Sequence, residues 1–119
     1  MTSQITLCSF TEWRDTPHAN APLQPLVIDV REPWELQTAR IEPDGFTLIC
    51  IPMRDIPQHI AALRDTYGQT HPIACLCHHG VRSLQVANYL THNGFTEVVN
   101  LQGGIDAWSK QIDAGVPIY

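Results

Sequence analysis

Short apolar runs alternate with segments of helical pattern along this chain, and this alternation restricts the fold more than composition does. The run at residues 26–30 is almost wholly apolar and rich in β-branched residues, which suits a strand covered on both faces, as in a parallel sheet. Similar short runs predict further strands at residues 6–8, 46–51, 73–76 and 98–101. Since strands and helices follow one another throughout, the sequence predicts an α/β protein with a mainly parallel sheet.

The segments between these runs carry helix signals. Ile56, Ile60 and Leu63 have the i, i+4, i+7 spacing that gives a helix one apolar face. Ser9 and Glu12 have the spacing of a capping box, which predicts a short helix near residue 12. Further helices are expected at residues 32–37, with Pro33 in the first turn, at residues 84–92, before Gly94, and at residues 105–108, after Gly103-Gly104. Residues 16–25 contain three prolines and are expected to form a loop.

Composition and charge narrow the function classes. The chain has 119 residues, of which 44% are hydrophobic and 16% charged, so residues 1–119 are expected to form one globular domain. Seven Lys and Arg residues against twelve Asp and Glu residues give a net charge of −5. This balance argues against binding to nucleic acid or to an anionic membrane, because either partner needs a basic surface.

The N-terminal residues and the cysteines bear on location. The first residues show neither the basic nor the apolar region of a secretory signal, and no apolar run approaches the ~20 residues that a membrane span needs. Four cysteines without an export signal indicate free thiols in a reducing compartment; they are Cys8, Cys50, Cys75 and Cys77. The sequence therefore predicts a cytoplasmic protein.

Residues 77–83, with the sequence Cys-His-His-Gly-Val-Arg-Ser, connect the predicted strand at 73–76 to the helix that follows. A cysteine at this place lies at the carboxyl edge of the sheet, where open α/β folds bind their ligands. The loop after it would direct backbone N–H groups inward, with the positive end of a helix dipole behind them. Such a cradle stabilises an anion, and the nearest candidate is the thiolate of Cys77 itself. Cys77 is therefore predicted to be a nucleophile.

Three stretches in this order resemble the rhodanese (sulfurtransferase) family. They are residues 28–32 (Ile-Asp-Val-Arg-Glu), the loop at 77–83, and residues 94–108, which end in Leu-Gln-Gly-Gly-Ile-Asp-Ala-Trp. The resemblance covers residues 5–117 and implies a three-layer fold, with a five-stranded, mainly parallel sheet flanked by helices. It also implies transfer of a sulfane sulfur through a cysteine persulfide. This chemistry requires no metal and no organic cofactor.

The resemblance also implies roles for residues of this chain. Cys77 would be the nucleophile, and the residues after it would supply the inward amides: His78, His79, Gly80, Val81 and Arg82. The Arg82 guanidinium would hold an anionic donor such as thiosulfate, which suits its planar fork of N–H groups. Asp29 and Arg31 resemble the family's pair at a strand end that braces the loop, and Ser83 would support the loop at its last position.

The predicted chemistry is a double displacement. The thiolate would attack the outer sulfur of the donor, sulfite would leave, and an acceptor thiol or cyanide would take the sulfur in a second step, which predicts ping-pong kinetics. The alternative function is a rhodanese-like module that relays sulfur to a sulfur-accepting protein, or docks onto a partner protein, with little turnover on thiosulfate.

Spacing argues against two other kinds of site. Four residues separate Cys77 from Arg82, whereas protein tyrosine phosphatases and the cell-cycle phosphatases that resemble rhodaneses place five between their cysteine and arginine. The shorter loop suits a sulfur atom on the cysteine better than a phosphate. Cys75 and Cys77 with the two following histidines lack the separated ligand pairs of a zinc site, so no metal is expected.

Structural interpretations remain open for several of these residues. Cys8, Cys50 and Cys75 are interpreted as small buried hydrophobes, with a resolving thiol as the alternative for Cys75. Asp29 and Arg31 are interpreted as a structural ion pair or a helix cap more readily than as a functional pair. A cation at the start of a helix opposes the helix dipole, which favours anion binding over a passive surface role for the arginine of the loop.

Overall fold

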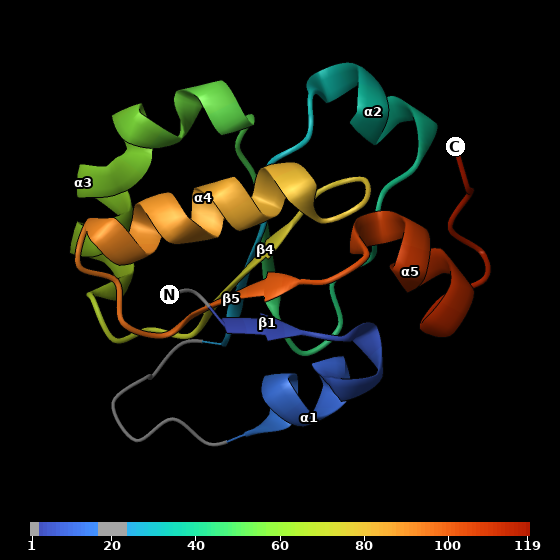
Figure 1. Ribbon diagram of the computed structural model, residues 1–119, viewed down its shortest axis with the longest axis horizontal. Coiled ribbons are helices and arrows are strands. Elements are labelled where there is room, and N and C mark those ends of the chain that lie inside the picture. The colour runs from blue at the N-terminus through green and yellow to red at the C-terminus, as the bar shows by residue number, and fades with distance from the viewer. Residues whose placement is uncertain (1–2, 17–23) are drawn as a thin grey trace.

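The computed structural model describes residues 3–16 and 24–119, in which five parallel strands form one sheet of order β1-β5-β4-β2-β3 (Figure 1). The strands are β1 (Ser3–Ile5), β2 (Leu26–Asp29), β3 (Thr47–Cys50), β4 (Ile73–Leu76) and β5 (Val98–Leu101). Every residue of β2 and β4 is buried, as expected for central strands covered on both faces. The predicted α/β class with a five-stranded parallel sheet is confirmed.

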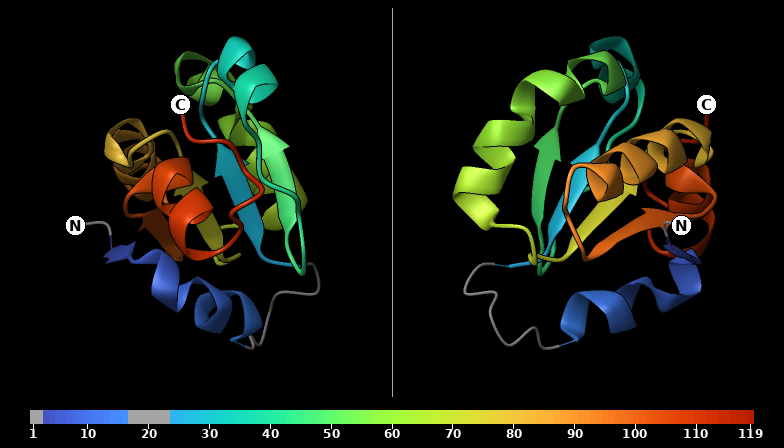
Figure 2. Two further views of the ribbon diagram at one scale, coloured as in Figure 1. Left: turned by 90° about the vertical axis from the view of Figure 1, so that its right-hand side faces the viewer. Right: turned by 60° about the vertical axis from the view of Figure 1, so that its left-hand side comes forward.

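Helices cover both faces of this sheet. They are α1 (Phe10–Asp15), α2 (Pro33–Thr38), α3 (Ile56–Tyr67), α4 (Val81–His92) and α5 (Gly104–Gln111), with short 3-10 helices η1 (Leu7–Ser9) and η2 (Met53–Asp55). α3 and α4 pack on one face, α1 and α5 pack on the other, and α2 lies beyond the carboxyl ends of β2 and β3 (Figure 2). None of the helices in the described ranges is long and apolar enough to cross a membrane.

The alternation of side chains along the central strands produces two cores. In β2, Leu26 and Ile28 belong to the core beneath α3 and α4, whereas Val27 between them belongs to the core beneath α1 and α5. In β4, Cys75 and Ala74 divide between the two faces in the same way. Both faces of these strands are therefore apolar, which explains the uninterrupted apolar runs in the sequence.

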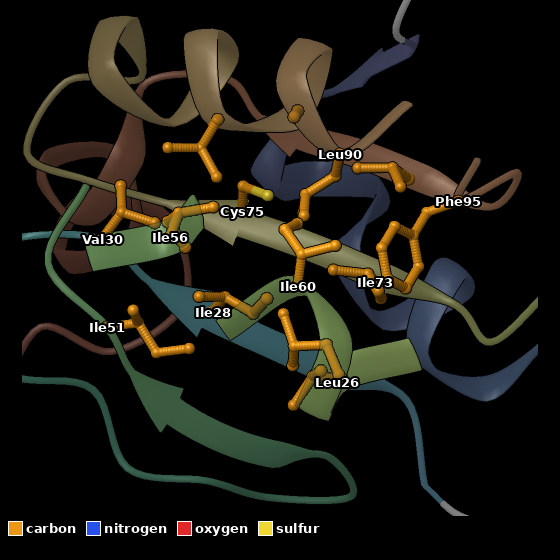
Figure 3. Packing of buried hydrophobic residues seen from close by; sticks show 14 of the residues in the cluster. Leu26, Ile28, Val30, Ile51, Ile56, Ile60, Ile73, Cys75, Leu90 and Phe95 are labelled. Atoms are coloured by element: carbon orange, nitrogen blue, oxygen red, sulfur yellow. The ribbon is translucent and has the colours of Figure 1, made fainter. Parts of the chain in front are cut away.

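The predicted apolar face of α3 is confirmed. Ile56, Ile60 and Leu63 are all buried and contribute to the core that α3 shares with α4. Figure 3 shows Ile60 of α3 and Leu90 of α4 directed into this core over the central strands of the sheet. This packing fixes α4, and with it the start of α4, relative to the carboxyl edge of the sheet.

The predicted first strand at residues 6–8 is wrong. The strand lies earlier, at Ser3–Ile5, and Leu7–Ser9 form the 3-10 helix η1. Among the described residues, β1 is an edge strand that pairs with β5 alone, and Ile5 lies opposite Leu101. Leu7 is buried in the core beneath α1 and α5, and it reaches this core from a helical turn rather than from a strand.

The capping box predicted for Ser9 and Glu12 does not form. Ser9 stands at the N-cap of α1 but makes no side-chain capping bond. Its backbone is already helical (φ −93°, ψ 0°) because it is the last residue of η1, whereas a capping serine has an extended backbone. Most of the loop predicted at residues 16–25 lies outside the described residues.

Candidate active site

Cys77 directly follows β4 at the carboxyl edge of the sheet. A short turn leads from it into α4, so that Arg82 and Ser83 lie in the first turn of that helix. Gly80, the residue before the helix, has φ +100°, a backbone conformation that favours glycine. The structure thus places Cys77 in a tight loop between a strand and a helix, as the sequence predicted.

The first turn of α5 supports this loop from behind. Ile105 N–H donates to the Cys77 carbonyl at 2.8 Å, and Asp106 N–H donates to the His78 carbonyl at 3.1 Å. Gly104 lies against the same peptide, with φ +60°, and a Cβ atom there would collide with the Cys77 carbonyl oxygen. The glycine pair of the third motif therefore allows the close approach of α5 to the loop, in addition to turning the chain.

Hydrogen-bond donors lie around the Cys77 sulfur, which belongs to a residue only 1% exposed. Gly80 N–H lies 3.1 Å from Sγ and Ser83 N–H lies 3.4 Å from it, and the Ser83 hydroxyl oxygen is 3.3 Å away. Of the amides that the family resemblance implies, that of Gly80 makes this contact within the described residues. A sulfur anion here faces N–H groups at the start of α4, and these donors favour it.

Arg82 is paired with a carboxylate. Its Nη1 and Nη2 lie 2.7 and 2.8 Å from the two carboxylate oxygens of Glu35, the bidentate geometry that a guanidinium favours. This contact with Arg82 lowers the pKa of Glu35 to about 2, although burial of the carboxyl acts in the opposite direction. Glu35 in turn raises the pKa of Arg82. The cation predicted to hold a donor therefore contributes little net positive charge to the resting site.

This ion pair leads to a pH prediction. Glu35 has its pKa lowered from 4.5 to about 2 on folding, so it stabilises the fold fully above pH 4.5 and loses this contribution as the pH falls through about 2. We expect the free energy of unfolding of the wild type to fall across that window. Glu35→Gln should be less stable at neutral pH and lack this part of the pH dependence. Urea denaturation of both proteins between about pH 5 and pH 2 measures the difference, and parallel curves would contradict it.

Tyr119 connects this pair to a second, fully buried one. Its hydroxyl donates to Glu35 Oε1 at 3.0 Å and accepts from Arg31 Nη1 at 3.0 Å. Arg31 binds Asp29 through Nε, 2.9 Å from Oδ1, and Nη2, 2.8 Å from Oδ2, and both residues are fully buried. Asp29 and Arg31 thus form a structural ion pair, one of the two structural roles that the sequence favoured for them. A chain of hydrogen bonds runs from the end of β2 to Arg82 at the active loop.

The two loop histidines stack with Tyr119. The ring centroids of His78 and His79 are 3.9 Å apart, and those of His78 and Tyr119 are 3.8 Å apart with their planes at 6°. His78 Nε2 lies 2.6 Å from the Tyr119 carbonyl oxygen, which can only accept, so Nε2 carries a proton. Beside the stack lies a hollow of about 460 Å³, within the size range of small-molecule sites. Its lining residues are Glu32, Trp34, Glu35, Thr38, His78, Arg82 and Tyr119.

Three residues of this site were not predicted from the sequence: Glu35, Tyr119 and Asn100. Glu35 carried a signal, because it stands three residues after Glu32, which is the spacing of a capping box, and its Oε2 accepts the Glu32 N–H at 2.9 Å. Asn100 also carried one, because it is a polar residue within the otherwise apolar strand β5, and it is fully buried. Tyr119 had no local signal, since all its contacts in the site are with residues distant in sequence.

The other cysteines differ in their surroundings. Cys75 is buried in the core beneath α3 and α4, and this burial raises the pKa of its thiol. The interpretation of Cys8 and Cys50 as buried hydrophobes is wrong, because both are exposed, Cys50 at the end of the edge strand β3. The part of the chain that the structure describes holds no group of three His, Cys, Asp or Glu side chains arranged to bind a metal ion.

Comparison with known families gives one match that spans most of the chain. Residues 11–111 match the family model described as "Rhodanese-like domain". The matched range contains the loop with Cys77, the Asp29–Arg31 pair and Glu35, and it ends before Tyr119.

Individual relatives and structures agree with this match. A protein of Allochromatium vinosum named "Sulfurtransferase" is 34% identical over 93 residues, which are 78% of this chain and 77% of that protein. The Arabidopsis thaliana "Rhodanese-like/PpiC domain-containing protein 12, chloroplastic" is 38% identical over 100 residues, and this chain spans only 30% of its length. The crystal structure of a rhodanese-like domain protein from Staphylococcus aureus has a TM-score of 0.69 and 29% identity, covering 100% of this chain and 99% of that one.

Proposed function

Because this chain belongs to the rhodanese-like domain family, we propose that it is a sulfurtransferase in which Cys77 carries the transferred sulfur. This proposal rests on the surroundings of the Cys77 sulfur atom, Sγ. Two backbone N–H groups, those of Gly80 and Ser83, lie within 3.4 Å of it, in a site shielded from water. Donors fixed in such a place stabilise an anion without having to reorganise during the reaction.

In the proposed first step, the Cys77 thiolate attacks the outer sulfur of thiosulfate. The S–S bond of the donor breaks, and sulfite leaves with the bonding electron pair. The protein then carries Cys77–S–S⁻, whose charge lies one bond away from that of the original thiolate, so the same loop can stabilise both anions. In the second step, a thiolate or cyanide acceptor attacks the terminal sulfur and releases the Cys77 thiolate.

The donor class we propose is a small anion with a sulfane sulfur, thiosulfate or a low-molecular-weight persulfide. The hollow beside the loop supports a small donor by its size, and Arg82 lines it together with its partner Glu35. A reducing compartment such as the cytoplasm would keep the Cys77 thiol available for the reaction.

Intact-protein mass spectrometry after incubation with thiosulfate tests the proposal. We expect the protein to gain the mass of one sulfur atom, located on Cys77 by peptide mapping and removed by cyanide or dithiothreitol. Rapid formation of thiocyanate supports an enzyme, whereas stable loading with slow release except to a partner protein supports the sulfur-relay alternative. If neither thiosulfate nor a low-molecular-weight persulfide loads the protein, sulfur transfer is excluded and a docking module remains.

Arg82→Ala is expected to lower kcat/KM for thiosulfate about 10- to 100-fold, the scale of a charge-assisted hydrogen bond. The substitution removes the cation beside the loop and leaves the Glu35 carboxylate without its strongest partner, next to the hollow. Arg82→Lys should recover only part of the loss, because an ammonium cannot form the bidentate contact. Steady-state kinetics with thiosulfate and cyanide measure these effects.

A double variant separates two causes of this loss. If Arg82 binds the donor itself, Arg82→Ala combined with Glu35→Gln should stay as slow as Arg82→Ala. If the loss comes from the unpaired charge of Glu35 repelling the donor, the double variant should recover most of the wild-type kcat/KM. Wild-type kinetics in Arg82→Ala alone would show that the ion pair has no part in donor binding.

A further inference from the structure

The Ser83 hydroxyl lies between the Cys77 sulfur and the Asn100 side chain. Its Oγ is 3.3 Å from Sγ of Cys77 and 2.6 Å from Oδ1 of Asn100. All three residues are at most 1% exposed. Because a hydroxyl group has one proton to donate, Ser83 can serve the sulfur or the amide oxygen, but not both at once.

The contacts of Asn100 decide which of the two receives the proton. Asn100 Nδ2 donates to the Gly80 carbonyl at 3.1 Å and to Gln4 Oε1 at 3.0 Å. Since a backbone carbonyl can only accept, the NH₂ group must face Gly80, and the amide oxygen must face Ser83. Two oxygens 2.6 Å apart need a proton between them, and the hydroxyl supplies it. Ser83 therefore donates to Asn100 and turns a lone pair toward Cys77.

We propose that Asn100 is a positioning residue that controls the protonation of Cys77 through the Ser83 hydroxyl. At rest, Ser83 Oγ accepts a hydrogen bond from the Cys77 thiol. When the thiol loses its proton to solvent, the sulfur anion faces this lone pair unless the hydroxyl rotates toward it. Rotation leaves the buried Oδ1 of Asn100 without a donor, which costs free energy. The free thiolate thus forms against a penalty that Asn100 sets.

A consequence for sulfur transfer, which rests on the proposed function, follows from where the charge lies. In Cys77–S–S⁻ the negative charge is on the outer sulfur, and Sγ is a neutral, weak acceptor. The Ser83 proton can then remain with Asn100, so the loaded protein avoids the penalty. Asn100 therefore favours the sulfur-loaded protein over the free thiolate.

The test is the pH dependence of Cys77 alkylation by iodoacetamide, followed by peptide mass spectrometry so that the exposed Cys8 and Cys50 are counted separately. Other groups that act on the pH profile of Cys77 are the same in every variant compared. Arg82, which is paired with Glu35, and the Cys75 thiol interact electrostatically with Cys77. The Asp29–Arg31 pair, His78, His79 and Asp106 are also unchanged in every variant. Differences between variants therefore report on Ser83 and Asn100.

In Asn100→Ala the Ser83 proton is free to serve the thiolate, so we expect the midpoint of the profile to move down by about one pH unit. In Ser83→Ala the thiolate loses the hydroxyl as a donor, but forming the thiolate no longer leaves Asn100 Oδ1 without a hydrogen bond. These effects oppose each other, and we expect a shift of less than about half a pH unit. The double variant should match Ser83→Ala, because Asn100 acts only through the hydroxyl.

The proposal is overturned if the midpoint of Asn100→Ala equals that of the wild type or lies above it. It is also overturned if Asn100→Ala shifts the midpoint by the same amount in the Ser83→Ala protein as in the wild type. If Asn100→Ala does not fold, Ser83→Ala decides alone. An upward shift of one pH unit or more would show that Ser83 simply donates to the thiolate, without competition. Alkylation does not require sulfur transfer, so a failure of thiosulfate loading and a failure of this proposal are distinguishable.

Discussion

A Cys77→Ser variant is expected to lose thiosulfate:cyanide sulfur transfer by roughly 10³-fold or more while it keeps the fold of the wild type. A serine hydroxyl is not ionised near neutral pH and cannot hold a transferable sulfur. The fold should survive because the serine oxygen occupies the same buried place, where the Gly80 and Ser83 N–H groups remain as donors. Initial rates and circular dichroism measure the two effects. Retained activity in the folded variant would move the nucleophile to another residue.

Cys75→Ala is the matched control for this experiment. Cys75 lies two residues before Cys77 and is part of the same core, and burial raises the pKa of its thiol, which keeps it protonated. We expect this variant to keep most of its activity and to lose about 1 kcal/mol of stability, as for a small change in a packed core. A loss of activity as deep as that of Cys77→Ser would show that Cys75 takes part in the reaction, for example as a resolving thiol.

The central strands could be predicted from the sequence because burial on both faces requires an uninterrupted run of apolar residues. β4 and β5 have the predicted bounds, and β2 ends one residue earlier than predicted. The edge strand β1 has no such apolar run, since Ser3 and Gln4 are polar and exposed. Leu7 led to the wrong prediction of a strand at residues 6–8, because a single apolar residue can be buried from a helical turn as well as from a strand.

The active site divides in the same way between local and distant information. The loop around Cys77 is contiguous, so its position between a strand and a helix could be read from neighbouring residues. The residues that contact this loop from elsewhere in the chain could not be predicted in this way. Glu35 lies 47 positions from Arg82, and Tyr119 lies 84 positions from Glu35. Such pairings depend on how the sheet and its helices assemble, and no spacing in the sequence encodes them.

The largest effect on stability is expected for the buried ion pair at the end of β2. Asp29→Asn should lower the free energy of unfolding by about 3–5 kcal/mol, because it leaves the charge of the fully buried Arg31 without its counter-ion. The side chain keeps nearly the same shape, so packing changes little and the loss reports on the charge. Urea denaturation at neutral pH measures this difference, provided that the slopes of the two unfolding curves agree.

Two comparisons separate the charge from other causes of the loss. Replacing both partners, with Asp29→Leu and Arg31→Met, should cost less than Asp29→Asn alone, since no uncompensated charge stays buried. Lys110→Met breaks the exposed ion pair with Asp106, in which Nζ and Oδ2 lie 2.9 Å apart. This distance is close to the 2.8 Å between Arg31 Nη2 and Asp29 Oδ2 in the buried pair. The effect of Lys110→Met should be much smaller, because solvent screens exposed charges. Equal losses from the buried and the exposed pair would show that burial does not determine the strength of the Asp29–Arg31 contact, and the account of how β2 supports the active loop would then be wrong.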